Sequence, residues 1–201
     1  SQQLVTQLTH GAPADVIASA DLAALQPLVK DGLIEPPQIF AVNQPVIIVQ
    51  GAARQQVTSL AQLPSVSRLV IGAPEVPIGR YTLQILDKAT PTLGPQFRAQ
   101  VEAKVVSREL TVRQVLARVL SGEAEAGIVY RTDVDAQALQ KLATVEIDPA
   151  FNVVAQYPMA LVRHEPPSAL AREFVSFVQG PVGQAVWREA GFAGPEGAVR
   201  Q

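Results

Sequence analysis

The 201-residue chain has no cysteine, two histidines, one methionine and one tryptophan. Without cysteine it can form no disulfide framework, no thiolate zinc site and no cysteine nucleophile. Two histidines leave little for a metal centre, and we expect both His10 and His164 to be surface residues. Charged residues make up only 17% of the chain, and the formal net charge is −2. With so few Lys and Arg residues the chain is a poor candidate for binding the phosphate backbone of a nucleic acid.

The chain also lacks long apolar runs. None approaches the roughly 20 residues that span a bilayer, and its first residues do not combine a charged region with an apolar one, so we expect no signal segment here. Hydrophobic residues nevertheless make up 48% of the sequence, which is enough to bury a full core. The sequence therefore predicts a folded chain, not a disordered one.

Short apolar segments alternate with amphipathic ones along the chain. We expect strands at 16–18, 45–49, 68–72, 104–107, 126–130, 142–147 and 153–162. We expect helices at 1–9, 21–32, 58–63, 81–88, 111–120, 167–178 and 181–190. This alternation predicts α/β architecture with mostly parallel sheets.

The common catalytic motifs are missing. The sequence has no Gly-x-Ser-x-Gly elbow, no phosphate-binding P-loop, no Gly-x-Gly-x-x-Gly and no His-Glu-x-x-His. Asp15, Asp21 and Asp133 lie at expected strand ends or helix starts, where capping explains a carboxylate. Nothing in these patterns supports an enzyme.

Four positions could instead donate hydrogen bonds to an anion. Ligands of open α/β sheets bind outside the carboxyl ends of strands, where helix N-termini present N–H groups and a partial positive charge. The candidates are the N-cap Ser1, the backbone N–H of Ile78 in the turn 74–81, the amide of Val112 and the phenol of Tyr130. Taken singly, each is better explained as an ordinary cap, loop, core or buried aromatic residue.

Taken together, the segments resemble the periplasmic molybdate-binding proteins of molybdate ABC transporters. The most specific motifs are Gly-Ala-Pro-Ala-Asp-Val at 11–16, Val-Pro-Ile-Gly-Arg-Tyr at 76–81 and Gly-Ile-Val-Tyr at 127–130. Matching segments follow the family's order over nearly the whole chain, at 7–21, 43–49, 72–81, 112–113, 127–130, 157–158 and 191–192.

The resemblance implies a two-lobed, type II periplasmic-binding-protein fold, with each lobe a mostly parallel sheet flanked by helices. It places the first lobe at 1–43 plus 158–192, the second at 44–157 and a flexible tail at 193–201. It also implies that a strand, a helix and a second strand precede Ser1, which leaves the first lobe incomplete and removes one of the family's two binding serines.

By motif, Ser1 resembles the family's second binding serine, Ile78 and Val112 its two backbone donors, and Tyr130 its phenolic donor. The family usually has a small residue at the position of Ile78, so this larger side chain must point away from the anion.

The expected ligand is molybdate or tungstate, without a cofactor and without catalysis. The expected partner is the membrane permease of an ABC transporter, and the chain is expected to be a monomer in the periplasm or anchored by lipid outside the cytoplasm. Alternatives are a receptor for another oxyanion such as sulfate, or the effector-binding domain of a transcription regulator. An enzyme of the hydroxymethylbilane-synthase type would need a cofactor-attaching cysteine, which the chain lacks.

Overall fold

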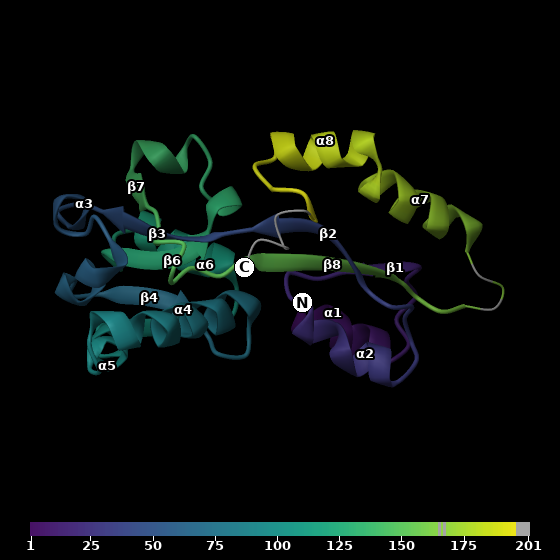
Figure 1. Ribbon diagram of the computed structural model, residues 1–201, viewed down its shortest axis with the longest axis horizontal. Coiled ribbons are helices and arrows are strands. Elements are labelled where there is room, and N and C mark those ends of the chain that lie inside the picture. Colours follow the sequence, from purple (N-terminus) through teal and green to yellow (C-terminus); the bar gives the residue numbers. More distant parts are fainter. Residues whose placement is uncertain (165, 167, 196–201) are drawn as a thin grey trace. The chain divides into compact units, whose positions relative to one another are not determined.

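Figure 1 shows a computed structural model of the chain, which describes residues 1–164, 166 and 168–195. The chain divides into two compact units. Unit 1 comprises Ser1–Asn43 and Val154–Gln201, and unit 2 comprises Gln44–Val153. No helix within the described residues is long and apolar enough to cross a membrane.

The sheet of unit 1 has three strands, in the order β1 (Val16–Ala18), β8 (Ala155–Leu161) and β2 (Gln38–Asn43). Both neighbouring pairs are antiparallel, so the expectation of a mostly parallel sheet is wrong for this unit. The reason is the chain path: β2 leaves the unit at Asn43, β8 re-enters it directly opposite, and Asn43 pairs with Ala155. Two strands that leave and return at one point must run in opposite directions.

Helices cover both faces of this sheet. Along β1 the side chains alternate. Ile17 packs with Ala160 and the helices α1 (Gln2–Thr9) and α2 (Gln26–Lys30), while Val16 and Ala18 pack with Met159 and the helices α7 (Ala169–Gln179) and α8 (Pro181–Glu189) (Figure 1). The helical elements are α1 (Gln2–Thr9), η1 (Ala23–Leu25), α2 (Gln26–Lys30), α7 (Ala169–Gln179) and α8 (Pro181–Glu189).

Unit 1 departs from the sequence expectations in three local ways. The helix expected at 21–32 is split into a 3₁₀ turn and α2, with Pro27 in the first turn of α2. Strand β2 was not expected, and residues 155–157, which pair with it, lie in unit 1, which the chain re-enters at Val154. Ala193, expected in the tail, exchanges two backbone hydrogen bonds with Val42 (3.0 and 2.9 Å), and positions 196–201 of that tail lie outside the described residues.

The sheet of unit 2 has five strands, in the order β5 (Val105–Glu109), β4 (Leu69–Gly72), β6 (Ala126–Tyr130), β3 (Pro45–Gln50) and β7 (Leu142–Val145). The pairs β4–β5 and β4–β6 are parallel, and the pairs β3–β6 and β3–β7 are antiparallel. The sheet is therefore mixed, because β3 brings the chain into the unit and runs against the strands that follow.

Two helices cover this sheet. Val115 and Val119 of α6 (Val112–Leu120) pack into a core cluster with Val46, Val70 and Val129. Helix α4 (Pro77–Leu93) packs against β4, β6 and β3. The connection from β4 to β5 moves across the sheet one way, and the connection from β5 to β6 moves back the other way. Because crossovers between parallel strands are right-handed, α4 and α6 lie on opposite faces of the sheet.

The remaining helical elements of unit 2 are short. The full set is α3 (Ala53–Gln56), η2 (Leu60–Ser65), α4 (Pro77–Leu93), α5 (Phe97–Glu102), α6 (Val112–Leu120), η3 (Arg131–Asp133) and η4 (Ala138–Gln140). Helix α4 extends beyond the expected 81–88 at both ends, because Pro77 suits a first helical turn and the helix ends at Gly94, whose φ is +113°.

The turn from β4 into α4 requires glycine at position 79. A Cβ on Gly79 would lie 1.9 Å from the carbonyl oxygen of Ala73, and 2.7 Å from that of Gly72. Both neighbours are backbone atoms that cannot rotate away. The start of α4 can therefore approach the end of β4 this closely only because residue 79 has no side chain.

We predict that Gly79→Ala lowers the free energy of unfolding by about 1–3 kcal/mol, because the added methyl group forces α4 away from β4. Chemical denaturation followed by circular dichroism measures this. Glu75→Ala, an exposed position in the same turn, is the matched control and should change stability by less than about 0.5 kcal/mol. Equal stability of Gly79→Ala and the unaltered chain would contradict the close contact.

Candidate functional site

Three of the four expected binding residues follow neighbouring strands of unit 2. Strands β5, β4 and β6 are parallel neighbours, so their carboxyl ends meet at one edge of the sheet. Beyond that edge β5 leads to Val112, β4 leads to Ile78, and β6 ends at Tyr130. The topology therefore brings together three residues that lie up to 52 positions apart in the sequence.

Ile78 lies in the first turn of α4. The turn is fixed by backbone hydrogen bonds: Ala73 N–H donates to the Glu109 carbonyl (2.8 Å), and Val76 N–H donates to the Ala73 carbonyl (3.1 Å). Proline at position 77 has no N–H, and the first N–H of α4 that has an intrahelical acceptor is that of Arg80, which donates to the Val76 carbonyl (3.0 Å). The N–H groups of Ile78 and Gly79 come before it and have no acceptor within the helix. The start of α4 thus presents two adjacent backbone donors.

The Ile78 side chain is buried, with 2% of its surface exposed. Its Cγ2 atom lies over Gly72, where a Cβ would come within 2.6 Å of it. The side chain is therefore part of the core of unit 2, and the residue can serve as a donor only through its backbone N–H.

Val112 is the first residue of α6, which a local capping box starts. The Thr111 hydroxyl accepts the Gln114 N–H (3.3 Å), and Gln114 Oε1 accepts the Thr111 N–H (3.1 Å). This reciprocal pair satisfies the amides of Thr111 and Gln114. The amides of Val112 and Arg113 are the ones that the box leaves for another acceptor.

Tyr130 ends strand β6, and 4% of its surface is exposed. Its ring packs edge-on against that of Tyr81 in the first turns of α4, with centroids 6.3 Å apart and planes at 73°. The aromatic contact holds the phenol between the strand end and α4. The sequence patterns identified Tyr130 but not the supporting role of Tyr81.

Ser1 belongs to unit 1, where it precedes helix α1. Ser1 is the N-cap of α1, as expected, but its hydroxyl accepts the Ala20 N–H (3.2 Å) and not an N–H of its own helix. The loop that carries Ala20 is itself fixed, because the buried Ser19 hydroxyl donates to the Asp21 carbonyl (2.9 Å) and Asp21 Oδ1 accepts the Ala23 N–H (2.7 Å). A hydroxyl that accepts one bond can still donate its own proton.

Asp133 is the functional candidate that sequence reasoning treated only as a cap. Its Oδ2 accepts the backbone N–H of Tyr130 (3.1 Å), so the capping role is confirmed. Burial raises the pKa of the carboxyl group from 3.8 to about 6, against the hydrogen bond from Tyr130 and the charge of Arg113, which both act to lower that pKa. A carboxyl group with such a pKa beside a candidate donor is itself a candidate functional residue.

The other titratable residues singled out by the sequence have local structural roles. His10 and His164 are exposed, as expected, and each places a ring nitrogen 2.7 Å from a backbone carbonyl oxygen. Asp15 is also exposed, 3.8 Å from His164. Within the described residues, no three His, Asp or Glu side chains are grouped as a metal ion would require.

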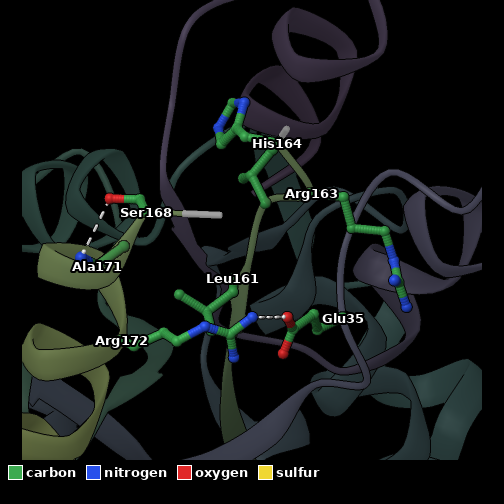
Figure 2. Close-up of a pocket in the computed structure, with 8 residues that line it drawn as sticks. Glu35, Leu161, Arg163, His164, Ser168, Ala171 and Arg172 are labelled. Atoms are coloured by element: carbon green, nitrogen blue, oxygen red, sulfur yellow. Dashed lines mark hydrogen bonds and ion pairs between the residues drawn. The ribbon is translucent and has the colours of Figure 1, made fainter. Parts of the chain in front are cut away.

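A pocket of about 300 Å³ in unit 1 does not coincide with the candidate residues (Figure 2). Its polar lining includes Arg163, His164, Arg172 and Glu35. Arg172 Nη2 lies 2.8 Å from Glu35 Oε1, and Arg163 Nε donates to a backbone carbonyl (3.2 Å). These polar groups thus have partners within unit 1.

The comparisons with known proteins define the class. The chain matches the family of bacterial extracellular solute-binding proteins over residues 1–193, so it belongs to that family. Within it, the chain is 37% identical over 198 residues to the molybdate-binding protein ModA of Mycobacterium tuberculosis, covering 97% of this chain and 71% of the relative. The resemblance that the motifs indicated is confirmed.

Solved structures agree on the fold. The periplasmic molybdate-binding protein of Azotobacter vinelandii superposes with a TM-score of 0.77 at 21% identity, covering 97% of this chain and 84% of that one. The sulfate-binding protein SubI of Mycobacterium tuberculosis gives a TM-score of 0.81 at 18% identity, covering 98% and 75%. These likenesses confirm the predicted α/β fold class, that of type II periplasmic binding proteins, with mixed in place of mostly parallel sheets.

The burial of Asp133 predicts a pH dependence of stability. The pKa of Asp133 is higher in the folded protein than in the unfolded chain, so the folded protein binds the proton more tightly. Above about pH 6 Asp133 is ionised, and its burial then lowers the free energy of unfolding. That loss is recovered as the pH falls through 6 toward about 4. Asp133→Asn keeps an acceptor without the charge and should raise the free energy of unfolding at pH 7.5 by up to about 3 kcal/mol.

Urea denaturation between about pH 4 and pH 7.5 measures this effect. Asp135→Asn is the control. Asp135 lies two residues after Asp133, is exposed, and accepts the Ala138 N–H. A slope of stability against pH that is the same in Asp133→Asn and in the unaltered chain would contradict the raised pKa.

Proposed function

We propose that the chain is the substrate-binding component of an ABC importer, which captures molybdate, and tungstate as well, and delivers it to a membrane permease. The observation that carries the proposal is the gathering of the Ile78 and Val112 amides and the Tyr130 phenol at one edge of the unit 2 sheet. The 37% identity to a molybdate-binding protein over nearly the whole chain supports molybdate as the ligand. Ser1 is the proposed fourth donor, from unit 1.

The donor chemistry suits a fully deprotonated dianion. Molybdate at neutral pH carries two negative charges and four acceptor oxygens, so a set of donors satisfies it. Phosphate keeps a proton at that pH, and a site without an acceptor leaves this proton unpaired at a cost of about 1–3 kcal/mol. Tungstate has nearly the size of molybdate and binds similarly, whereas the smaller sulfate is selected against by the size of the site.

The remaining features of the proposal follow from the family. Units 1 and 2 are the two lobes, the protein acts as a monomer without a cofactor, and it binds its ligand without catalysing a reaction. It works in the periplasm or anchored by lipid outside the cytoplasm, in keeping with a family of extracellular proteins.

A sulfate receptor is the second candidate, because sulfate is a dianion that accepts from the same kind of donors. The effector-binding domain of a transcription regulator is the third, and a basic helix-turn-helix segment in the same gene product would identify it.

Calorimetric titration of the purified protein with molybdate, tungstate, sulfate and phosphate tests the proposal. We expect tight binding of molybdate and tungstate and much weaker binding of the other two. Tyr130→Phe should weaken molybdate binding by about 1–3 kcal/mol, because it removes one donor to a charged group. Tyr157→Phe, a phenol of unit 1 packed against Phe40 and Phe192, is the matched control and should bind like the unaltered protein. A clear signal for sulfate alone would replace the assignment with the second candidate.

The backbone donor at Val112 can be tested by proline. Val112→Pro removes the amide proton at a helix position that proline favours, and Thr111 already has the extended backbone that precedes proline (φ −141°, ψ 149°). We expect molybdate affinity to fall by about 1–3 kcal/mol while the free energy of unfolding stays nearly unchanged. Val112→Ala shortens the side chain but keeps the amide, and should bind like the unaltered protein. Equal affinity of the two variants would remove this amide from the site.

A further inference from the structure

Asp133 links two of the proposed donors. It ends the short η3 turn that follows β6, and its Oδ2 accepts the Tyr130 N–H at 3.1 Å. The same turn packs against α6, whose first residue is Val112. The carboxyl group therefore lies where the end of β6 and the start of α6 come together.

The Tyr130 N–H needs this acceptor because the sheet ends there. The pairing of β4 with β6 stops at Val70 opposite Gly127, three residues before Tyr130. On the other side β3 begins at Pro45, directly opposite Tyr130. The Asp133 carboxylate supplies the acceptor that a carbonyl of a neighbouring strand would otherwise supply to the Tyr130 N–H. This bond fixes the backbone that carries the Tyr130 side chain.

The charged and titratable groups around Asp133 are few. Arg113 of α6 is the charged side chain whose field acts on it. Arg131, on η3 itself, forms an ion pair with Glu146 beyond β7. Tyr130, whose backbone N–H donates to Asp133, and Tyr81 of α4, whose ring packs on that of Tyr130, carry the two nearby phenols. A mostly buried carboxylate in this setting has little solvent to screen it from a bound anion.

We propose that Asp133 is a positioning residue for the oxyanion: it fixes Tyr130 beside the first turn of α6, and its negative charge, when present, opposes the bound dianion. This inference rests on the proposed function. Protonated Asp133 still accepts the Tyr130 N–H through its carbonyl oxygen but no longer repels the ligand. Oxyanion affinity therefore rises as Asp133 takes up its proton, and by linkage a bound oxyanion favours protonation of Asp133.

Molybdate titrations at about pH 5.5 and pH 7.5, at which molybdate stays a dianion, test the inference with three variants. The unaltered protein should bind about three- to ten-fold more tightly at the lower pH, the size expected for repulsion between a carboxylate and a nearby dianion. Asp133→Asn keeps the acceptor without the charge, so it should bind tightly and equally at both pH values. Asp133→Ala loses the acceptor as well and should bind more weakly than Asp133→Asn at both, whereas Asp135→Asn should follow the unaltered protein.

The outcomes separate this inference from the proposed function. Molybdate binding by Asp133→Asn with the pH profile of the unaltered protein overturns the inference alone, as does equal affinity of Asp133→Asn and Asp133→Ala. If Asp133→Ala does not fold, as circular dichroism would show, the pH profile of Asp133→Asn decides by itself. Failure of the folded, unaltered protein to bind molybdate at either pH overturns the proposed function, and this inference with it.

Discussion

The parallel pairing of β4 between β5 and β6 is the constraint on which the candidate site depends. The three strands run in the same direction, so all three end at one edge of the sheet. The edge is also where the chain enters unit 2, since Pro45 at the start of β3 pairs with Tyr130. If one of these strands ran in the opposite direction, the residue that follows it would lie at the other edge of the sheet.

Two local features orient the backbone donors at the starts of α4 and α6. At α4 the absence of a side chain at Gly79 lets the helix start pack on the Ala73 carbonyl, and the buried Ile78 side chain anchors the turn over Gly72. At α6 a capping box uses two amides and leaves those of Val112 and Arg113 for another acceptor. Backbone donors of this kind do not depend on side-chain identity, so an isoleucine at position 78 is compatible with the role.

The low charge of the chain is consistent with this design. Neutral amides, hydroxyls and helix N-termini can hold a dianion without a basic patch, and a site without acceptors disfavours ligands that carry a proton. The carboxyl group of Asp133 is the exception near the donors. Its bond to the Tyr130 N–H gives a reason for an acidic residue beside the candidate site, because the carboxylate supplies the acceptor that a neighbouring strand would otherwise provide at the end of the sheet.

The sequence by itself determined the elements whose signals are local. Strands β1 and β6 match their expected bounds, and α6 begins within one residue of its expected start, because Thr111 and Gln114 cap it through neighbours three positions apart. The sequence also indicated all four candidate donors, through helix starts, a strand end and the family motifs. These features need no knowledge of distant contacts.

Only the tertiary structure decided what depends on pairing across the chain. Strand β2 forms against β8, more than a hundred residues later, and the direction of that pair follows from where the chain leaves and re-enters unit 1. The Ser1 hydroxyl accepts the Ala20 N–H and not an N–H of its own helix, and Asp133, the last residue of η3, acquires its raised pKa from burial. Periodicity and capping rules act over a few residues, whereas burial and strand order arise only when distant segments pack together.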